Sequence, residues 1–343
     1  MNNSVLNNLL TKDLKINQKY VTNILNNDNY SSEKISKLKE ETNKILGSEL
    51  KDNICIFLVG SYGRLEASQN SDLDCIFIHK DKLEKSEKEE ICLNIFGIAK
   101  KNGIIKTPGD TGTFKEFVKL ETLLKNIGGI NDTNKNLTRR ILILTESYFL
   151  FNDDLCKEVI SAIFNKYTEK AKKSEKEPRE LINELVRYYR TITIDYKYKI
   201  EEAKKSWGIR NLKLRHSRKL LFFTSISIIF TAMKKFEKNN YEDKYNYIFE
   251  NINRPPIIKL GKVLIENDKS LNHEPFIYYN KFLEFISDEK ILQELDNLDY
   301  SKRHSNRIYS EFKKNSDRLD ESLKDLIKSI DDWDDLFYRY IVF

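Results

Sequence analysis

The chain has 343 residues, of which 33% are charged and 40% are hydrophobic, and its formal net charge is +6. This length allows two domains, and the apolar share excludes an intrinsically disordered protein. The positive charge favours anionic partners such as nucleotides or nucleic acid. A bias toward Lys, Asn and Ile from base composition explains the charge equally well, so charge alone defines no function.

Neither a membrane nor an oxidising compartment is indicated. The four cysteines lack CxxC spacing, and two of them lie in strand-like apolar runs, so we expect buried, reduced thiols. The longest apolar run, residues 220–233, is shorter than the ~20 residues that span a bilayer. The first 20 residues lack the plan of a signal peptide. We therefore expect a cytoplasmic protein without membrane segments.

The predicted elements change in character near residue 50. Residues 1–48 carry leucine and isoleucine at helical spacing. Residues 54–59 and 72–78 are apolar runs typical of strands that are covered on both faces. Residues 84–101 return to helical spacing, and residues 112–120 form a third, weaker strand candidate.

Beyond residue 122 we expect helices only, including 137–151, 153–169, 179–203 and 211–238. Prolines between these helices mark their ends, because proline lacks a backbone donor and disfavours helix at the preceding residue. The predicted fold is therefore α+β. A small mixed-sheet domain with N-terminal helices occupies residues 1–125, and an all-helical domain that contacts nucleotide or acceptor occupies residues 126–343.

The segment most informative about function is IFLVGSYGRLEASQNSDLDCIFI, residues 56–78. Because side chains alternate along a strand, Asp72 and Asp74 would point the same way, about 6.6 Å apart. Two converging carboxylates repel each other unless a cation pairs with them. Hard oxygen ligands favour Mg²⁺ or Mn²⁺, held together with substrate phosphates.

Gly60 and Ser61 end the preceding strand. Glycine allows close approach of a ligand to the backbone, and a helix that starts here would offer N–H groups to phosphate. Ser61 adds a hydroxyl donor, and Arg64 can bind phosphate or instead pair with Glu66 or an aspartate. Each feature alone is more often a turn or a solvated strand end. Their combination indicates a nucleotide site with a divalent metal.

GSYGRLEASQNSDLD resembles the signature of the DNA polymerase β-like nucleotidyltransferase superfamily. The resemblance implies that Gly60 and Ser61 bind the phosphates of a nucleoside triphosphate and that Asp72 and Asp74 bind two magnesium ions. The motif is most similar to the bacterial uridylyltransferases of the PII protein and adenylyltransferases of glutamine synthetase. Residues 127–147 are a looser likeness to the region after the catalytic domain in that group. The resemblance implies the catalytic class and leaves the acceptor open.

The expected chemistry is in-line attack of an acceptor hydroxyl on the α-phosphate, with pyrophosphate leaving. A third carboxylate normally completes such a site and can act as the base. Asp110 is the first candidate and Glu116 the second. Asp110 lies in a Pro-Gly-Asp-Thr-Gly stretch, which a simple turn explains equally well.

The helical region contains one basic segment, WGIRNLKLRHSRKLLFF at residues 207–223. Arg215, Arg218 and Lys219 share a helix face that could contact the triphosphate or an RNA acceptor, although a solvated basic face is the plainer interpretation. Arg210 and His216 are compatible with the Arg and His arrangement of HEPN-type ribonucleases.

Three functions therefore follow from the sequence. The first is a metal-dependent nucleotidyltransferase that moves a nucleoside monophosphate to a protein, an RNA or a small molecule. The second is a catalytically silent nucleotide sensor whose helical domain contacts a partner. The third is ribonuclease activity in the helical domain.

Overall fold

The computed structural model describes residues 3–47, 50, 52–106, 113–202, 206–236 and 240–342. The chain divides into two compact units. The sheet unit comprises Asn27–Lys176 and Ile252–Pro255, and the helical unit comprises Met1–Asn26, Glu177–Asn251 and Pro256–Phe343. The predicted domain boundary between residues 125 and 126 stays a prediction.

The sheet has four strands in the order β3-β2-β1-β4. These are β1 (Ile54–Val59), β2 (Asp74–His79), β3 (Phe117–Lys119) and β4 (Tyr148–Phe151). Strand β1 pairs antiparallel with β2 and β4, whereas β2 pairs parallel with β3. The sheet is therefore mixed, and the predicted α+β fold is confirmed.

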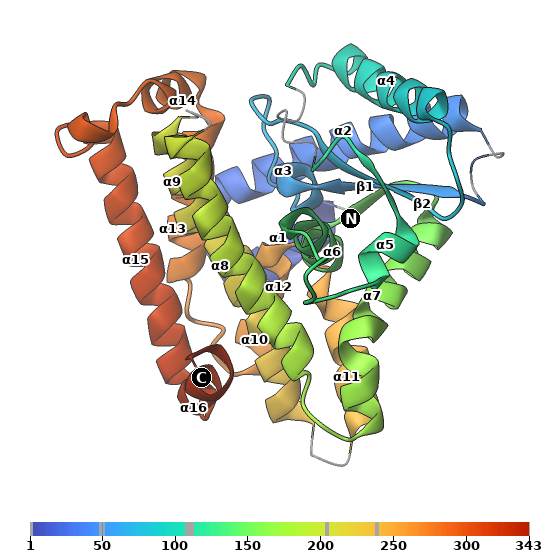
Figure 1. Cartoon of the computed structure of the whole chain (residues 1–343). Helices are drawn as coiled ribbons and strands as arrows, with labels where there is room; N and C mark the ends of the chain where they lie inside the picture. The colour runs from blue at the N-terminus through green and yellow to red at the C-terminus, as the bar shows by residue number, and fades with distance from the viewer. Residues whose placement is uncertain are drawn as a thin grey trace. The chain divides into compact units, whose positions relative to one another are not determined.

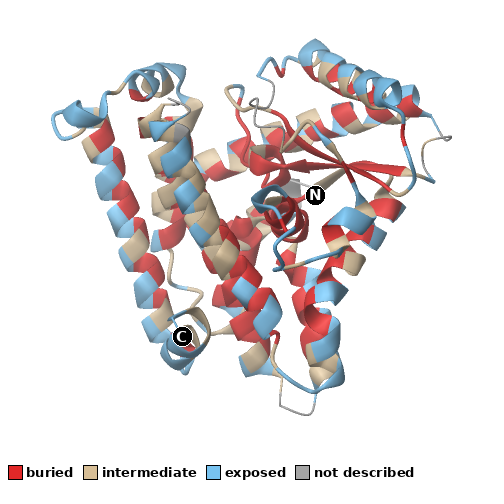
Figure 2. Ribbon diagram, in the orientation of Figure 1, coloured by how far each residue is buried: buried red, intermediate tan, exposed pale blue. Residues whose placement is uncertain are grey.

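Helices cover both faces of this sheet (Figure 1). On one face, α2 (Thr22–Leu46) and α4 (Lys85–Lys101) share a core with alternate residues of β1 and β2 such as Ile56 and Phe77. On the other face lie α6 (Asn134–Glu146) and α7 (Asp153–Lys173). Every residue of β1 and β2 is buried, which explains their continuous apolar sequence (Figure 2).

Three predicted elements of this unit differ from the structure. Strand β2 begins at Asp74, two residues later than predicted, and β3 covers only Phe117–Lys119. The helix predicted over 137–151 ends at Glu146, because the N–H of Ser147 donates to the side chain of Asn253 and the chain then continues as β4. The run is apolar in either conformation, so periodicity alone could not separate the helix from the strand that follows it.

The helical unit is built from α-helices joined by short turns. Their bounds are α8 (Arg179–Glu201), α9 (Trp207–Lys213), α10 (Lys219–Lys235), α11 (Tyr241–Ile252), α12 (Pro256–Glu266), α13 (Glu274–Ser287), α14 (Glu289–Asp296), α15 (Arg307–Ser329) and α16 (Trp333–Phe337). A π-helical turn, Leu214–Arg218, joins α9 to α10, and another, Tyr338–Val342, follows α16.

The N-terminal segment packs within this helical unit. It contains α1 (Asn3–Asn8), a π-helical turn at Leu9–Asp13 and a 3₁₀ turn at Gln18–Tyr20. A Cβ at Gly261 of α12 would lie 2.9 Å from the side chain of Leu9. The side chain of Asn280 in α13 accepts the backbone N–H groups of Asn23 and Ile24. Residues 9–24 thus pack against α12 and hydrogen-bond to α13.

Within the described residues, no helix has both the length and the hydropathy needed to span a bilayer. The apolar run at residues 220–233 lies in α10, where most side chains are buried in the helical unit.

Candidate active site

The structure brings Gly60 and Asp74 together. Antiparallel pairing of β1 with β2 places Val59 opposite Asp74, so the turn at Gly60 follows directly. Gly60 has φ +69°, and a Cβ there would lie 2.7 Å from Oδ2 of Asp74. A side chain at position 60 would therefore be strained and would collide with the carboxylate. Glycine is required because the aspartate approaches its backbone.

Asp72 lies just before β2 and is half-buried, with the buried Leu73 between it and Asp74. Its carboxylate is close enough to interact electrostatically with the phenol of Tyr62, which belongs to the short helix α3 (Gly60–Gly63). Burial raises the pKa of Tyr62 well above its usual value, and Tyr30 and Asp72 raise it further. Both aspartates therefore lie by the turn that begins at Gly60.

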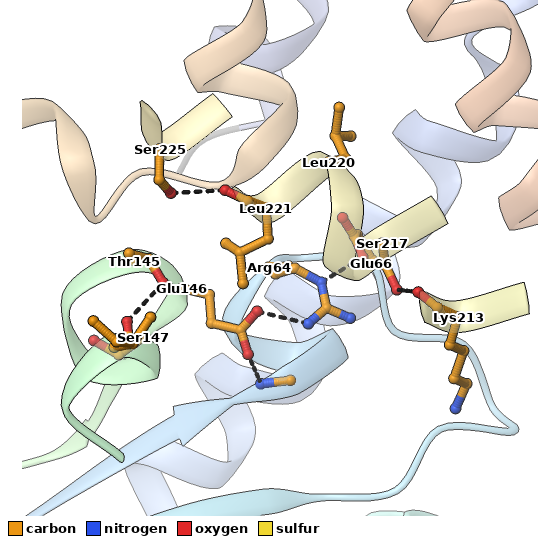
Figure 3. A network of polar contacts seen from close by, with 12 residues as sticks. Arg64, Glu66, Thr145, Glu146, Ser147, Lys213, Ser217, Leu220, Leu221 and Ser225 are labelled. Carbon is orange, nitrogen blue, oxygen red and sulfur yellow. Dashed lines mark hydrogen bonds and ion pairs between the residues drawn. The ribbon is translucent and has the colours of Figure 1, made fainter. Parts of the chain in front are cut away.

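A buried carboxylate of α6 holds this turn in place. Glu146 has a fully buried side chain, accepts the N–H of Gly60 at 2.9 Å through Oε1, and pairs with Arg64 at 2.7 Å through Oε2. Arg64 also pairs with Glu66 at 2.7 Å. Figure 3 shows the guanidinium of Arg64 with its dashed contacts to these two glutamates. The structure thus realises the pairing of Arg64 with Glu66, and contact of Arg64 with phosphate stays a prediction.

This arrangement changes which groups of the turn can meet a phosphate. The N–H of Gly60 is already donated to Glu146. The hydroxyl of Ser61, in contrast, is half-buried and has no hydrogen-bond partner among the described residues. Gly63 serves packing, because a Cβ there would lie 2.0 Å from the carbonyl oxygen of Glu146. Ser61 is therefore the side chain of the turn best suited to contact phosphate.

Sequence reasoning missed Glu146. A signal was present, because Glu146 follows the apolar run ILIL in a helix that proved almost wholly buried. A carboxylate in such a place needs a cation or several donors. Its partners lie 82 and 86 residues away along the chain, so the local sequence could not name them.

The donor set around the turn fits a hard cation in part. Asp72 and Asp74 offer carboxylate oxygens of the kind that bind Mg²⁺. Among the described residues, no group of three or more Asp, Glu, His or Cys side chains could hold a metal. Asp110 lies outside the described residues. Glu116 precedes β3 instead of lying within it, is exposed, and pairs with Lys135 and Arg139.

The predicted basic face belongs to the helical unit and contacts α15. Arg215 bonds Ser316 and Asp317 at 3.1 Å, and Lys219 pairs with Asp320. Arg218 also has a partner within the chain. Contact of these three residues with nucleotide stays a prediction.

His216 is a core residue. Its ring is fully buried and stacks on Phe282 with a centroid distance of 4.4 Å. Nδ1 lies 2.9 Å from the carbonyl oxygen of Leu212, and the side-chain amide of Asn315 donates to Nε2. Burial lowers the pKa of His216 to about 3. RNA could not reach this imidazole in the folded unit, which removes the basis of the ribonuclease alternative.

Residues 35–168 match the family model described as a nucleotidyltransferase domain. The matched segment contains the four strands, the turn at Gly60 and both aspartates. Over residues 35–168 the chain is therefore similar to nucleotidyltransferase domains, which agrees with the polymerase β-like motif around Gly60 and Asp74. A search among curated proteins gave no match to the chain.

Proposed function

We propose that the protein is a metal-dependent nucleotidyltransferase that transfers a nucleoside monophosphate from a nucleoside triphosphate to the hydroxyl of an acceptor. The observation that supports this best is the contact between Asp74 and the backbone of Gly60. A carboxylate so close to a turn that bears a hydroxyl donor suits a ligand that brings both phosphate and a cation.

In this proposal Asp72 and Asp74 hold Mg²⁺ or Mn²⁺, and Ser61 contacts the phosphates. The bound cation supplies neutralisation of the phosphate charge. The acceptor oxygen forms a bond to the α-phosphorus while the bond to pyrophosphate breaks, and the acceptor proton passes to a base. Asp110 is the first candidate for that base and Glu116 the second. Glu146 and Arg64 keep the turn in position throughout.

The likeness to PII uridylyltransferases and glutamine synthetase adenylyltransferases supports a hydroxyl acceptor. The proposed acceptors are a hydroxyl of a protein side chain, of an RNA end or of a small molecule.

The test is incubation with each α-labelled nucleoside triphosphate in Mg²⁺ or Mn²⁺, with a cell extract from which nucleotides have been removed as the source of acceptor. If the protein is this enzyme, label appears on a protein, an RNA or a small product, and it is lost in the double variant Asp72→Asn/Asp74→Asn. Asp154→Asn is the matched control, because Asp154 is an almost fully exposed carboxylate of α7. The control variant should transfer label at the wild-type rate.

A catalytically silent nucleotide sensor is the second candidate. It is favoured because no group of three or more Asp, Glu, His or Cys side chains that could hold a metal is found among the described residues. Metal-dependent nucleotide binding that needs both aspartates, without transfer to any acceptor, would support the sensor and contradict the enzyme.

A further inference from the structure

A long groove runs along α4 in the sheet unit. Its volume is about 940 Å³. One wall is a stripe along α4, formed by residues spaced three or four apart from Lys85 to Lys100. Residues 104–105 and 115–117 form the other wall. At ~1.5 Å per residue the stripe is about 22 Å long, so the mean cross-section is about 40 Å². The groove is elongated and admits one row of side chains.

Large apolar side chains are exposed on both walls of this groove. Leu93 on α4 is 74% exposed, and Ile105 on the facing wall is 77% exposed. Phe96 on the α4 wall and Phe117 on the facing wall are only partly buried. Single exposed aliphatic residues are ordinary, but several that line one groove mark an interaction site.

Gly97 lies in the same stripe of α4. A glycine inside a helix is destabilising relative to alanine, because the unfolded chain loses more freedom. Here a Cβ would meet nothing within 4 Å, and φ is not in the left-handed region. The fold of this chain therefore gives no reason for a glycine. Its absent side chain does let a second backbone approach the groove closely.

The rim of the groove is positively charged. Among the described residues, no carboxylate pairs with Lys88, Lys100 or Lys115. The two acidic residues of the rim, Glu89 and Glu116, are each within ion-pair distance of a basic side chain of this chain. The lysines thus leave an uncompensated positive field beside an apolar surface.

We propose that this groove binds an amphipathic helix of a partner protein. The apolar stripe of that helix packs between Leu93 and Ile105, and acidic residues beside the stripe face Lys88 and Lys100. The length of the groove matches about four turns of helix. An amphipathic helix laid in an apolar groove is a recurrent mode of recognition, and complementary charges set its orientation. Gly97 marks the point of closest approach.

The probe is a synthetic helical peptide of about 18 residues with a leucine stripe flanked by glutamates. The control peptide keeps the stripe and carries lysines in place of the glutamates. Fluorescence anisotropy of the labelled peptides is measured with the full chain at low and high salt. The acidic peptide should bind at least about tenfold more tightly than the basic one, and salt should weaken it.

Variants of the groove locate the binding. Leu93→Glu and the double variant Lys88→Glu/Lys100→Glu should each weaken binding about tenfold or more. Gly97→Gln should weaken binding to a similar extent by filling the groove, while the melting temperature of the protein is kept or raised. This pairing separates a lost interaction from a damaged fold.

Two matched controls lie in the same unit and outside the groove. Ile130→Glu changes an exposed isoleucine, and Lys170→Glu changes an exposed lysine of α7. Neither should alter the affinity. The proposal is wrong if both peptides bind alike, if neither binds, or if the controls weaken binding as much as the groove variants. It is also wrong if the chain dimerises through Leu93, or if dodecanoate fills the groove and the peptide does not.

Discussion

The contact of Glu146 with Gly60 and Arg64 gives the sharpest prediction. In Glu146→Ala, the buried guanidinium of Arg64 loses one of its carboxylate partners, and the N–H of Gly60 loses its acceptor. Breaking a buried ion pair by removing one partner costs about 3–5 kcal/mol. Glu146→Gln keeps an oxygen for Gly60 and loses one charge-assisted hydrogen bond, worth about 1.5–3 kcal/mol.

Urea unfolding followed by far-UV circular dichroism measures these free energies of unfolding. Glu146→Gln should lower the free energy by about 2 kcal/mol, and Glu146→Ala by about twice that. Arg64→Gln completes a double-mutant cycle with Glu146→Gln. Because the two side chains touch, the double variant should lose less than the sum of the single losses, by about 1 kcal/mol or more.

The reasoning fails on either of two results. One is a loss below about 0.5 kcal/mol in Glu146→Gln, which is the usual range for surface substitutions. The other is additivity within about 0.5 kcal/mol in the cycle, which would show that Arg64 and Glu146 act independently.

Three further predictions concern packing and titration. Gly63→Ala should destabilise the protein by about 2 kcal/mol or more, because the added Cβ would collide with the backbone of Glu146. Gly97→Ala should instead stabilise it by about 0.5–1 kcal/mol, because a Cβ there meets nothing. Equal changes in the free energy of unfolding of the two variants, measured in urea, would refute this contrast. Burial raises the pKa of Asp28 from 3.8 to about 6, so stability should fall as pH rises through that window. Asp28→Asn should remove a fall of up to about 3 kcal/mol, and an unchanged profile would contradict this. Burial lowers the pKa of His216 from 6.5 to about 3, so stability should fall as pH drops through that window. His216→Ala should lower the melting temperature by several degrees, and an unchanged value would contradict its place in the core.

The sequence predicted those elements of the sheet unit whose conformation is determined by residues close together in the chain. Strand β1 was predicted at its observed bounds, because an apolar run covered on both faces differs from its polar flanks. The helix at residues 84–101 was predicted within one residue, since its apolar spacing is regular. Strand β4 was missed because its conformation depends on pairing with β1, about 90 residues earlier in the chain.

The candidate site shows the same division. The motif placed Gly60, Ser61 and the two aspartates in one short segment, where a superfamily likeness could be recognised. The ion-pair partners of Arg64, in contrast, include the carboxylate of Glu146 on α6, which only the folded chain reveals. His216 was interpreted from spacing in a segment rich in lysine and arginine, where such spacing arises by chance and says nothing about burial.

The discontinuity of the helical unit has a consequence for synthesis of the chain. Residues 1–26 leave the ribosome before the sheet unit does, yet their packing partners in α12 and α13 lie beyond residue 255. The sheet unit lacks only residues 252–255 once Lys176 has emerged, so most of it can form while the opening segment still waits for its neighbours. Completion of the helical unit then depends on helices that are made after the sheet unit, and a chain that stopped before α12 would leave the apolar side chains of residues 1–26 without their partners.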